Sequence, residues 1–103
     1  MNPFGNPKQL MKQLQQAQER VQKEIAALEI EAVSGGGMVR VVMDGQKNVK
    51  SLKIDPEVVS KDDVEMLQDL VTAAVNEAAR KVDEAVQEKI GGLTGGMKLP
   101  GMF

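Results

Sequence analysis

The first apolar pattern along the chain has helical spacing. From Asn6 to about Glu31, apolar residues recur at intervals of three, four and seven within a stretch rich in good helix formers. Asn6 suits the N-cap, and Pro7 suits the first helical position. At helical spacing, one arc of roughly 80° holds Leu10, Leu14, Ala17, Val21, Ile25 and Leu28. So narrow an apolar seam is typical of a coiled-coil helix rather than of a helix lying flat on a large core.

The pattern then changes to the alternation of β-strands. Strands are predicted over residues 39–43 and 49–54, and over residues 28–34 if the helix ends a few residues early. Leu52 and Ile54 share one face of the last strand, and the sequence DGQKN at 44–48 supplies turn chemistry before it. Pro56 closes the sheet, because proline cannot donate to a strand ladder.

Three consecutive glycines, Gly35 to Gly37, precede the middle strand. A phosphate-binding glycine motif follows a strand and opens a helix whose N-terminus receives the phosphate, and a P-loop adds Lys followed by Ser or Thr. Here the glycines lead into a β-patterned run and that Lys is missing. We therefore expect a hairpin turn in which glycine supplies positive φ, and not a phosphate site.

The last apolar pattern is again helical, from Lys61 to Ile90. Ser60 followed by Asp63 is close to a capping box, and acidic residues crowd the first turn, where the helix dipole favours them. A catalytic carboxylate pair at Asp62 and Asp63 is the alternative interpretation, and capping is favoured. Gly91 and Gly92 are predicted to stop the helix. Its broad apolar side holds Leu67, Leu70, Val71, Ala74, Ala78, Val82 and Ala85.

These elements predict an α+β fold: a long helix, a three-stranded antiparallel β-meander and a second long helix (α-β-β-β-α) over residues 1–90. Residues 91–103 are predicted to form a flexible glycine-rich tail, although its apolar residues leave a docking segment as the alternative. A 30-residue helix is about 45 Å long, whereas a compact domain of this length has a radius of gyration of roughly 13 Å. Two such helices cannot both be covered within one chain, so we expect a homodimer.

Composition excludes most enzyme chemistry. The 103 residues include no cysteine and no histidine, so disulfides, thiolate or imidazole metal sites and Ser-His-Asp triads are excluded. With two phenylalanines as its only aromatic residues, the chain has no platform on which single-stranded bases could stack. No apolar run is long enough for a secretion signal or a membrane span. We expect a cytoplasmic protein that is not an enzyme and needs no cofactor, metal, membrane or small-molecule substrate.

Charge is distributed unevenly along the chain. The net charge is −2, yet residues 1–54 carry eight bases against five acids, and residues 55–103 carry five against ten. On the first helix, a sector of roughly 120°, centred about 160° from the apolar seam, holds Lys8, Lys12, Arg20 and Lys23. Such a row suits the phosphates of a duplex. The alternative is an ordinary solvated face, with ion pairs Glu19–Lys23 and Arg20–Glu24 at i,i+4 spacing.

The whole chain resembles the bacterial YbaB/EbfC nucleoid-associated proteins. The resemblance lies in the order of elements and in NPKQLMKQLQQAQ, GGGMVRVVMDGQKNVKSLKIDPEVV, MLQDLVTAAVNEAARKVDE and the C-terminal GMKLPGMF. The glycine hairpin running into KIDPEVV and the block DLVTAAVNEAARK are the most specific of these. The resemblance implies a homodimer with a shared sheet and pairs of projecting helices that binds double-stranded DNA and helps to organise the nucleoid.

Carried over to this chain, the DNA-binding surface is the exposed faces of those helices. It comprises Lys8, Lys12, Arg20 and Lys23, with Arg80, Lys81 and Lys89 as weaker additions. The hypothesis is a homodimer in the nucleoid that contacts mainly backbone phosphates, reads duplex shape rather than bases, and contributes to nucleoid organisation and gene regulation. The alternative is a dimeric adaptor that binds another protein and has no direct role with nucleic acid.

Overall fold

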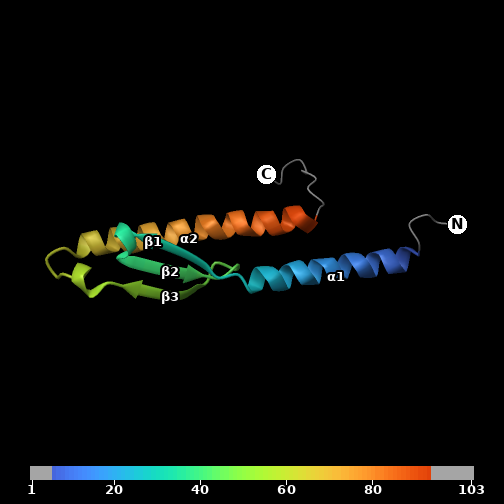
Figure 1. The fold of residues 1–103 in the computed structure, drawn as a ribbon, viewed down its shortest axis with the longest axis horizontal. Helices are drawn as coiled ribbons and strands as arrows, with labels where there is room; N and C mark the ends of the chain where they lie inside the picture. Colours follow the sequence, from blue (N-terminus) through green and yellow to red (C-terminus); the bar gives the residue numbers. More distant parts are fainter. Residues whose placement is uncertain (1–5, 94–103) are drawn as a thin grey trace.

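The computed structural model describes residues 6–93 (Figure 1). Its elements are α1 (Pro7–Ala26), β1 (Ile30–Ser34), the 3-10 turn η1 (Gly35–Gly37), β2 (Val39–Met43), β3 (Val49–Ile54), the 3-10 turn η2 (Pro56–Val58) and α2 (Val64–Leu93). The predicted α+β fold with α-β-β-β-α order is confirmed. The molecule is elongated, with extents of 75 × 24 × 16 Å and a radius of gyration of 19.8 Å. No helix within residues 6–93 is long and apolar enough to cross a membrane.

The three strands form an antiparallel sheet in the order β1-β2-β3. Alternation along β2 turns Val39, Val41 and Met43 toward α2, which lies across β1 and β2 and leaves β3 uncovered (Figure 1). The buried core consists of Ala32, Val39, Val41, Met43, Ala74, Ala78 and Val82. Its α2 members include two alanines, whose small side chains let the helix approach the sheet closely.

The first helix ends earlier than the apolar pattern suggests. We expected helix to about Glu31, but α1 stops at Ala26 and β1 starts at Ile30, as the alternative of an early end allowed. The physical reason is the close approach of the β2–β3 turn: a Cβ placed on Gly45 would lie 1.9 Å from the carbonyl oxygen of Ile25. Strand pairing of β1 with β2 then replaces helical hydrogen bonding.

Both predicted ends of the second helix were wrong by a few residues. The helix begins at Val64 rather than Lys61, because the Asp63 carboxylate accepts from the amide of Met66 at 3.2 Å, as an N-cap does. The helix also continues through Gly91 and Gly92 to Leu93. Glycine ends a helix by taking the left-handed conformation, and neither glycine has a positive φ. The rest of the predicted tail, residues 94–103, lies outside the described residues.

The two predicted turns are confirmed as connections between strands. Gly35, Gly36 and Gly37 have φ values of 58°, 68° and 98°, so the glycines supply the positive φ expected of this hairpin. In the β2–β3 turn, one carboxylate oxygen of Asp44 accepts from the amides of Gln46 and Asn48, both at 2.9 Å. Helix α1 lies beyond the end of the sheet at which the β2–β3 turn is found (Figure 1).

Candidate nucleic-acid interface

Helix α1 is the element that carries most of the predicted interface. The Asn6 side chain accepts from the amide of Lys8 at 2.9 Å, and Pro7 occupies the first turn, so the N-terminus is capped as predicted. Its 20 residues span about 30 Å. All of them are described by the structure, and none is buried. The helix therefore runs out from the sheet with most of its surface in solvent (Figure 1).

Four cations of α1 form what we call the basic face: Lys8, Lys12, Arg20 and Lys23. All four are exposed, and no ion pair holds any of them within residues 6–93. The alternative of pairs Glu19–Lys23 and Arg20–Glu24 is not realised. Glu24 instead approaches Lys89 of α2, with 3.6 Å between the carboxylate oxygen and Nζ. The charges of the basic face are therefore available to an external anion.

The three predicted cations of α2 are held by partners within the chain. The Arg80 guanidinium donates to the carboxylates of both Glu77 and Glu84. Its hydrogen bond to Glu77 lowers the pKa of that carboxyl and raises the pKa of Arg80 itself. Nζ of Lys81 donates to the backbone carbonyl of Glu31 in β1 at 3.2 Å. With Lys89 beside Glu24, these three side chains are poorer candidates for phosphate contacts than those of the basic face.

The structure brings one member of the basic face close to α2. Arg20 and Glu24 of α1 line a depression of about 420 Å³ together with Glu88 and Lys89 of α2. Two cations and two carboxylates meet there, so the depression has no excess of positive charge. Arg80 and Lys81 do not line this depression. They lie on the part of α2 that packs against the sheet, where Lys81 contacts β1.

A pair of cations on the sheet was not included in the prediction. Arg40 and Lys53 are cross-strand neighbours, and they lie on the face opposite α2 because Val41 faces the helix. Arg40 is paired with Glu31 at 2.9 Å, whereas Lys53 forms no ion pair with any described residue. The alternation along β2 was the signal that could have placed these residues on the open face of the sheet.

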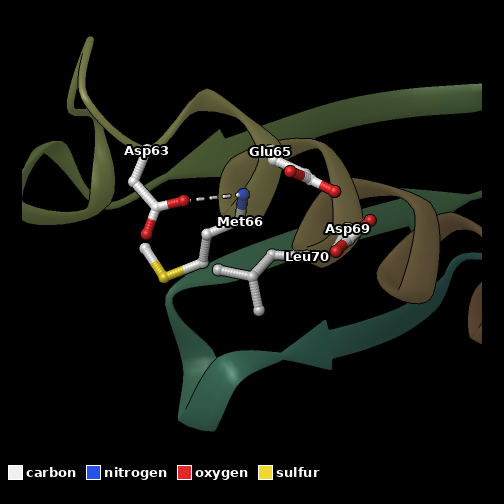
Figure 2. Close-up of a pocket in the computed structure, with 5 residues that line it drawn as sticks. All are labelled: Asp63, Glu65, Met66, Asp69 and Leu70. Atoms are coloured by element: carbon white, nitrogen blue, oxygen red, sulfur yellow. Dashed lines mark hydrogen bonds between the residues drawn. The ribbon is translucent and has the colours of Figure 1, made fainter.

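A second depression lies at the start of α2, where the sequence left a catalytic carboxylate pair as an alternative. Figure 2 shows its lining: Asp63, Glu65, Met66, Asp69 and Leu70. Asp63 is engaged in capping through the amide of Met66, and Asp62 is not part of the lining. Within residues 6–93, no cluster of three acidic side chains is arranged to hold a metal ion. Helix capping is confirmed for Asp63, but Asp63 is the N-cap itself rather than the last residue of a capping box that starts at Ser60.

Comparisons with known proteins identify relatives of this chain by sequence. The profile of the YbaB/EbfC DNA-binding family matches residues 3–97. A nucleoid-associated protein of Koribacter versatilis is 56% identical over 93% of this chain and 95% of its own length. A nucleoid-associated protein of Acetivibrio thermocellus is 53% identical over 96% of this chain and 91% of its own length.

A solved structure shares the fold. The crystal structure of the uncharacterized protein HP0035 from Helicobacter pylori superposes with a TM-score of 0.74 at 21% identity, covering 91% of this chain and 99% of that chain. At this identity the structural match supports a shared fold only. Membership of a family is shown by the family profile and by the bacterial relatives. From the profile match over nearly its whole length and the relatives above 50% identity, the chain belongs to the YbaB/EbfC DNA-binding family, which is a family of nucleoid-associated DNA-binding proteins and not of enzymes.

Proposed function

We propose that this protein binds double-stranded DNA through the basic face of α1, mainly by contacts to backbone phosphates. The observation that carries the proposal is that no described residue forms an ion pair with the cations of this face, whereas the cations of α2 contact carboxylates or, for Lys81, a backbone carbonyl. Long flexible cationic side chains on a straight helix can follow a phosphate backbone and displace its counterions. Binding of this kind reads the shape of the duplex rather than its bases.

The binding species is a homodimer. A single chain leaves one face of its sheet incompletely covered, because α2 packs on β1 and β2 and leaves the same face of β3 open. Several large apolar residues are exposed on β3 and around the β3–α2 connection: Val49, Leu52, Val59, Val64 and Met66. A second copy that covers this apolar surface would complete the core and present two basic faces to one duplex.

In the cell, such a dimer acts in the nucleoid, as the names of the relatives from Koribacter and Acetivibrio indicate for those proteins. Its role is to contribute to nucleoid organisation and gene regulation. Binding is modest, because the net charge of the chain is −2 and few phosphates are contacted.

The test is a salt-titrated duplex binding curve measured together with sedimentation. If each subunit makes about two phosphate contacts, affinity falls roughly 100-fold between about 50 and 200 mM salt. Sedimentation should give a dimer at micromolar concentration. A monomer at that concentration, or affinity that does not change with salt, contradicts the proposal.

The residue assignment is tested by converting Lys8, Lys12, Arg20 and Lys23 to glutamine together. This variant should lose the duplex gel shift while it remains folded and dimeric, because none of the four side chains is buried or forms an ion pair within residues 6–93. If the variant shifts DNA as the parent does, the assigned surface is wrong. A parent protein that is dimeric and captures a protein partner, but gives no duplex gel shift even at low salt, would support the adaptor alternative.

A further inference from the structure

The apolar seam of α1 is covered along only part of its length. Its inner residues Ala17, Val21 and Ile25 are half-buried against the C-terminal part of α2. Farther out, Leu10 and Leu14 of the same seam are 44% and 56% exposed. Exposed leucines at consecutive seam positions make a continuous apolar strip.

The cover ends because α2 ends. Gly92 lines the same depression as Ala17, so the last turn of α2 lies beside the middle of α1. Beyond that level no residue within 6–93 covers the strip formed by Leu10 and Leu14. The chain itself continues from this point, with Thr94 following directly after the last residue of α2.

The continuing segment has the length and composition to cover the strip. Residues 94–103 read TGGMKLPGMF, with four large apolar residues, one lysine and no acidic residue. Ten extended residues reach up to about 33 Å, whereas Leu10 lies only about 10 Å along the helix axis from Ala17. Pro100 disfavours continued helix, and the two methionines adapt to an irregular apolar surface.

We propose that residues 94–103, the C-terminal segment, dock on the α1 of their own chain over Leu10 and Leu14. The segment thereby prolongs the cover that α2 gives to the inner part of the seam. The strip lies about 160° around α1 from the centre of the basic face, so the docked segment leaves the basic face open. The inference is independent of what the basic face binds.

A second copy of α1 fits the strip less well. A coiled coil between two α1 helices needs an apolar seam free over three or more heptads. Here the inner part of the seam is already in contact with α2, and the free part offers only Leu10 and Leu14 with Met11 at its edge. A short extended segment can use such a strip, whereas a helix pair cannot.

The experiment uses disulfide formation in the full-length chain, which has no cysteine of its own. Leu14→Cys is combined with Met97→Cys, and the matched control combines Gln16→Cys with Met97→Cys. Gln16 is exposed at a similar height on α1 but roughly 160° around the helix from Leu14. Docking predicts that the Leu14 pair closes at least about tenfold faster than the Gln16 pair under mild oxidation, within one chain.

Three outcomes of these cross-linking experiments overturn the proposal. Equal rates for both pairs show that the segment has no preferred site on α1. In the single variant Leu14→Cys, a disulfide between two chains that forms faster than the Leu14–Met97 disulfide within one chain shows that a second copy covers the strip. Finally, a Leu14–Met97 disulfide between chains, formed when the two single variants Leu14→Cys and Met97→Cys are mixed, shows that the segment docks on another chain rather than on its own.

A second measurement does not depend on introduced cysteines. Met97, Leu99, Met102 and Phe103 are changed to serine in the full-length chain, and amide hydrogen exchange is followed in residues 8–15. Docking predicts faster exchange there with unchanged exchange in β2, because the seam loses its cover while the core is intact. Unchanged exchange in residues 8–15 rejects docking, whatever the variant's affinity for DNA.

Discussion

Both helices of this protein are amphipathic, but only α2 contributes side chains to the buried core. In α2, Ala74, Ala78 and Val82 are fully buried against the sheet. In α1, all of whose residues the structure describes, none is buried. The difference extends to charge, since the cations of α2 contact carboxylates or a backbone carbonyl, and those of the basic face form no ion pair with any residue that the structure describes. An exposed lysine or arginine therefore becomes a candidate for binding only when its neighbours leave it unpaired.

The largest expected effect concerns stability. Ala78→Asp places a charge in the core between α2 and the sheet and should destabilise the fold by at least about 3 kcal/mol, a large share of the stability of a small domain. The same change at the exposed Ala26 of α1 should cost less than about 1 kcal/mol, mainly through the helix dipole. Urea unfolding followed by circular dichroism measures both. Equal costs would mean that the two helices are equally integrated into the fold.

The next effect concerns DNA binding and compares equal changes of charge. Lys8, Lys12 and Lys23 of α1 are changed to glutamine in one variant, and Arg80, Lys81 and Lys89 of α2 in the other. At about 50 mM salt the α1 variant should lose about 100-fold in duplex affinity, because unpaired cations release counterions from phosphates. The α2 variant should lose less than about threefold, because its cations are already engaged.

Fluorescence anisotropy with one duplex measures both variants, and their circular dichroism spectra provide the check on folding. The order of the two losses is decisive. A greater loss in the α2 variant would place the interface on α2 and reverse the comparison between the helices.

Much of this architecture was predictable from local pattern. The alternation in residues 39–43 identified β2 and its buried side chains, and the three glycines identified the hairpin before it. The unpaired state of the basic face was not predictable, because Glu19 and Glu24 stand at the spacing that allows ion pairs along α1. Only the position of Lys89 on the neighbouring helix shows that Glu24 has another partner.

The errors at the helix ends have different physical origins. Helical propensity continues past Ala26, but contact with the β2–β3 turn at Gly45 ends α1 there. Glycine at 91 and 92 reads as a stop signal, yet a glycine without positive φ can remain in the helix at a cost of about 1 kcal/mol. At the end of α1 a tertiary contact accompanies the boundary, whereas at Gly91 and Gly92 the backbone stays helical with nothing within 4 Å of the position of a Cβ.

The third effect compares two glycines: Gly45, whose turn contacts the end of α1, and Gly92 in the last turn of α2. Gly45→Ala should cost about 2 kcal/mol, because the new Cβ would overlap the backbone carbonyl of Ile25 and force α1 away from the turn. Gly92→Ala meets nothing within 4 Å and should stabilise α2 by about 0.5 to 1 kcal/mol. Thermal unfolding of the two variants measures the difference. The two substitutions should change the free energy of unfolding in opposite directions. A Gly92→Ala variant less stable than the parent would show that α2 does not extend through this residue.

The smallest effect concerns the ion pairs within α2, which have no counterpart among the described residues of the basic face of α1. Arg80 lowers the pKa of Glu77 below its usual 4.5, first through its hydrogen bond and then through its charge. A carboxyl with a lowered pKa in the folded state stabilises the fold above its unfolded-state pKa, and this contribution disappears as the pH falls through the folded-state value. Arg80→Gln should therefore move the pKa of Glu77 back toward 4.5, measured by carbon NMR of the Glu77 carboxyl during an acid titration.

The corresponding change in α1, Arg20→Gln, should leave the titration of Glu77 unaltered, because Arg20 has no ion pair within residues 6–93. A shift of Glu77 as large in Arg20→Gln would show that its pKa follows the overall charge of the chain, and the distinction between paired and unpaired cations would then fail.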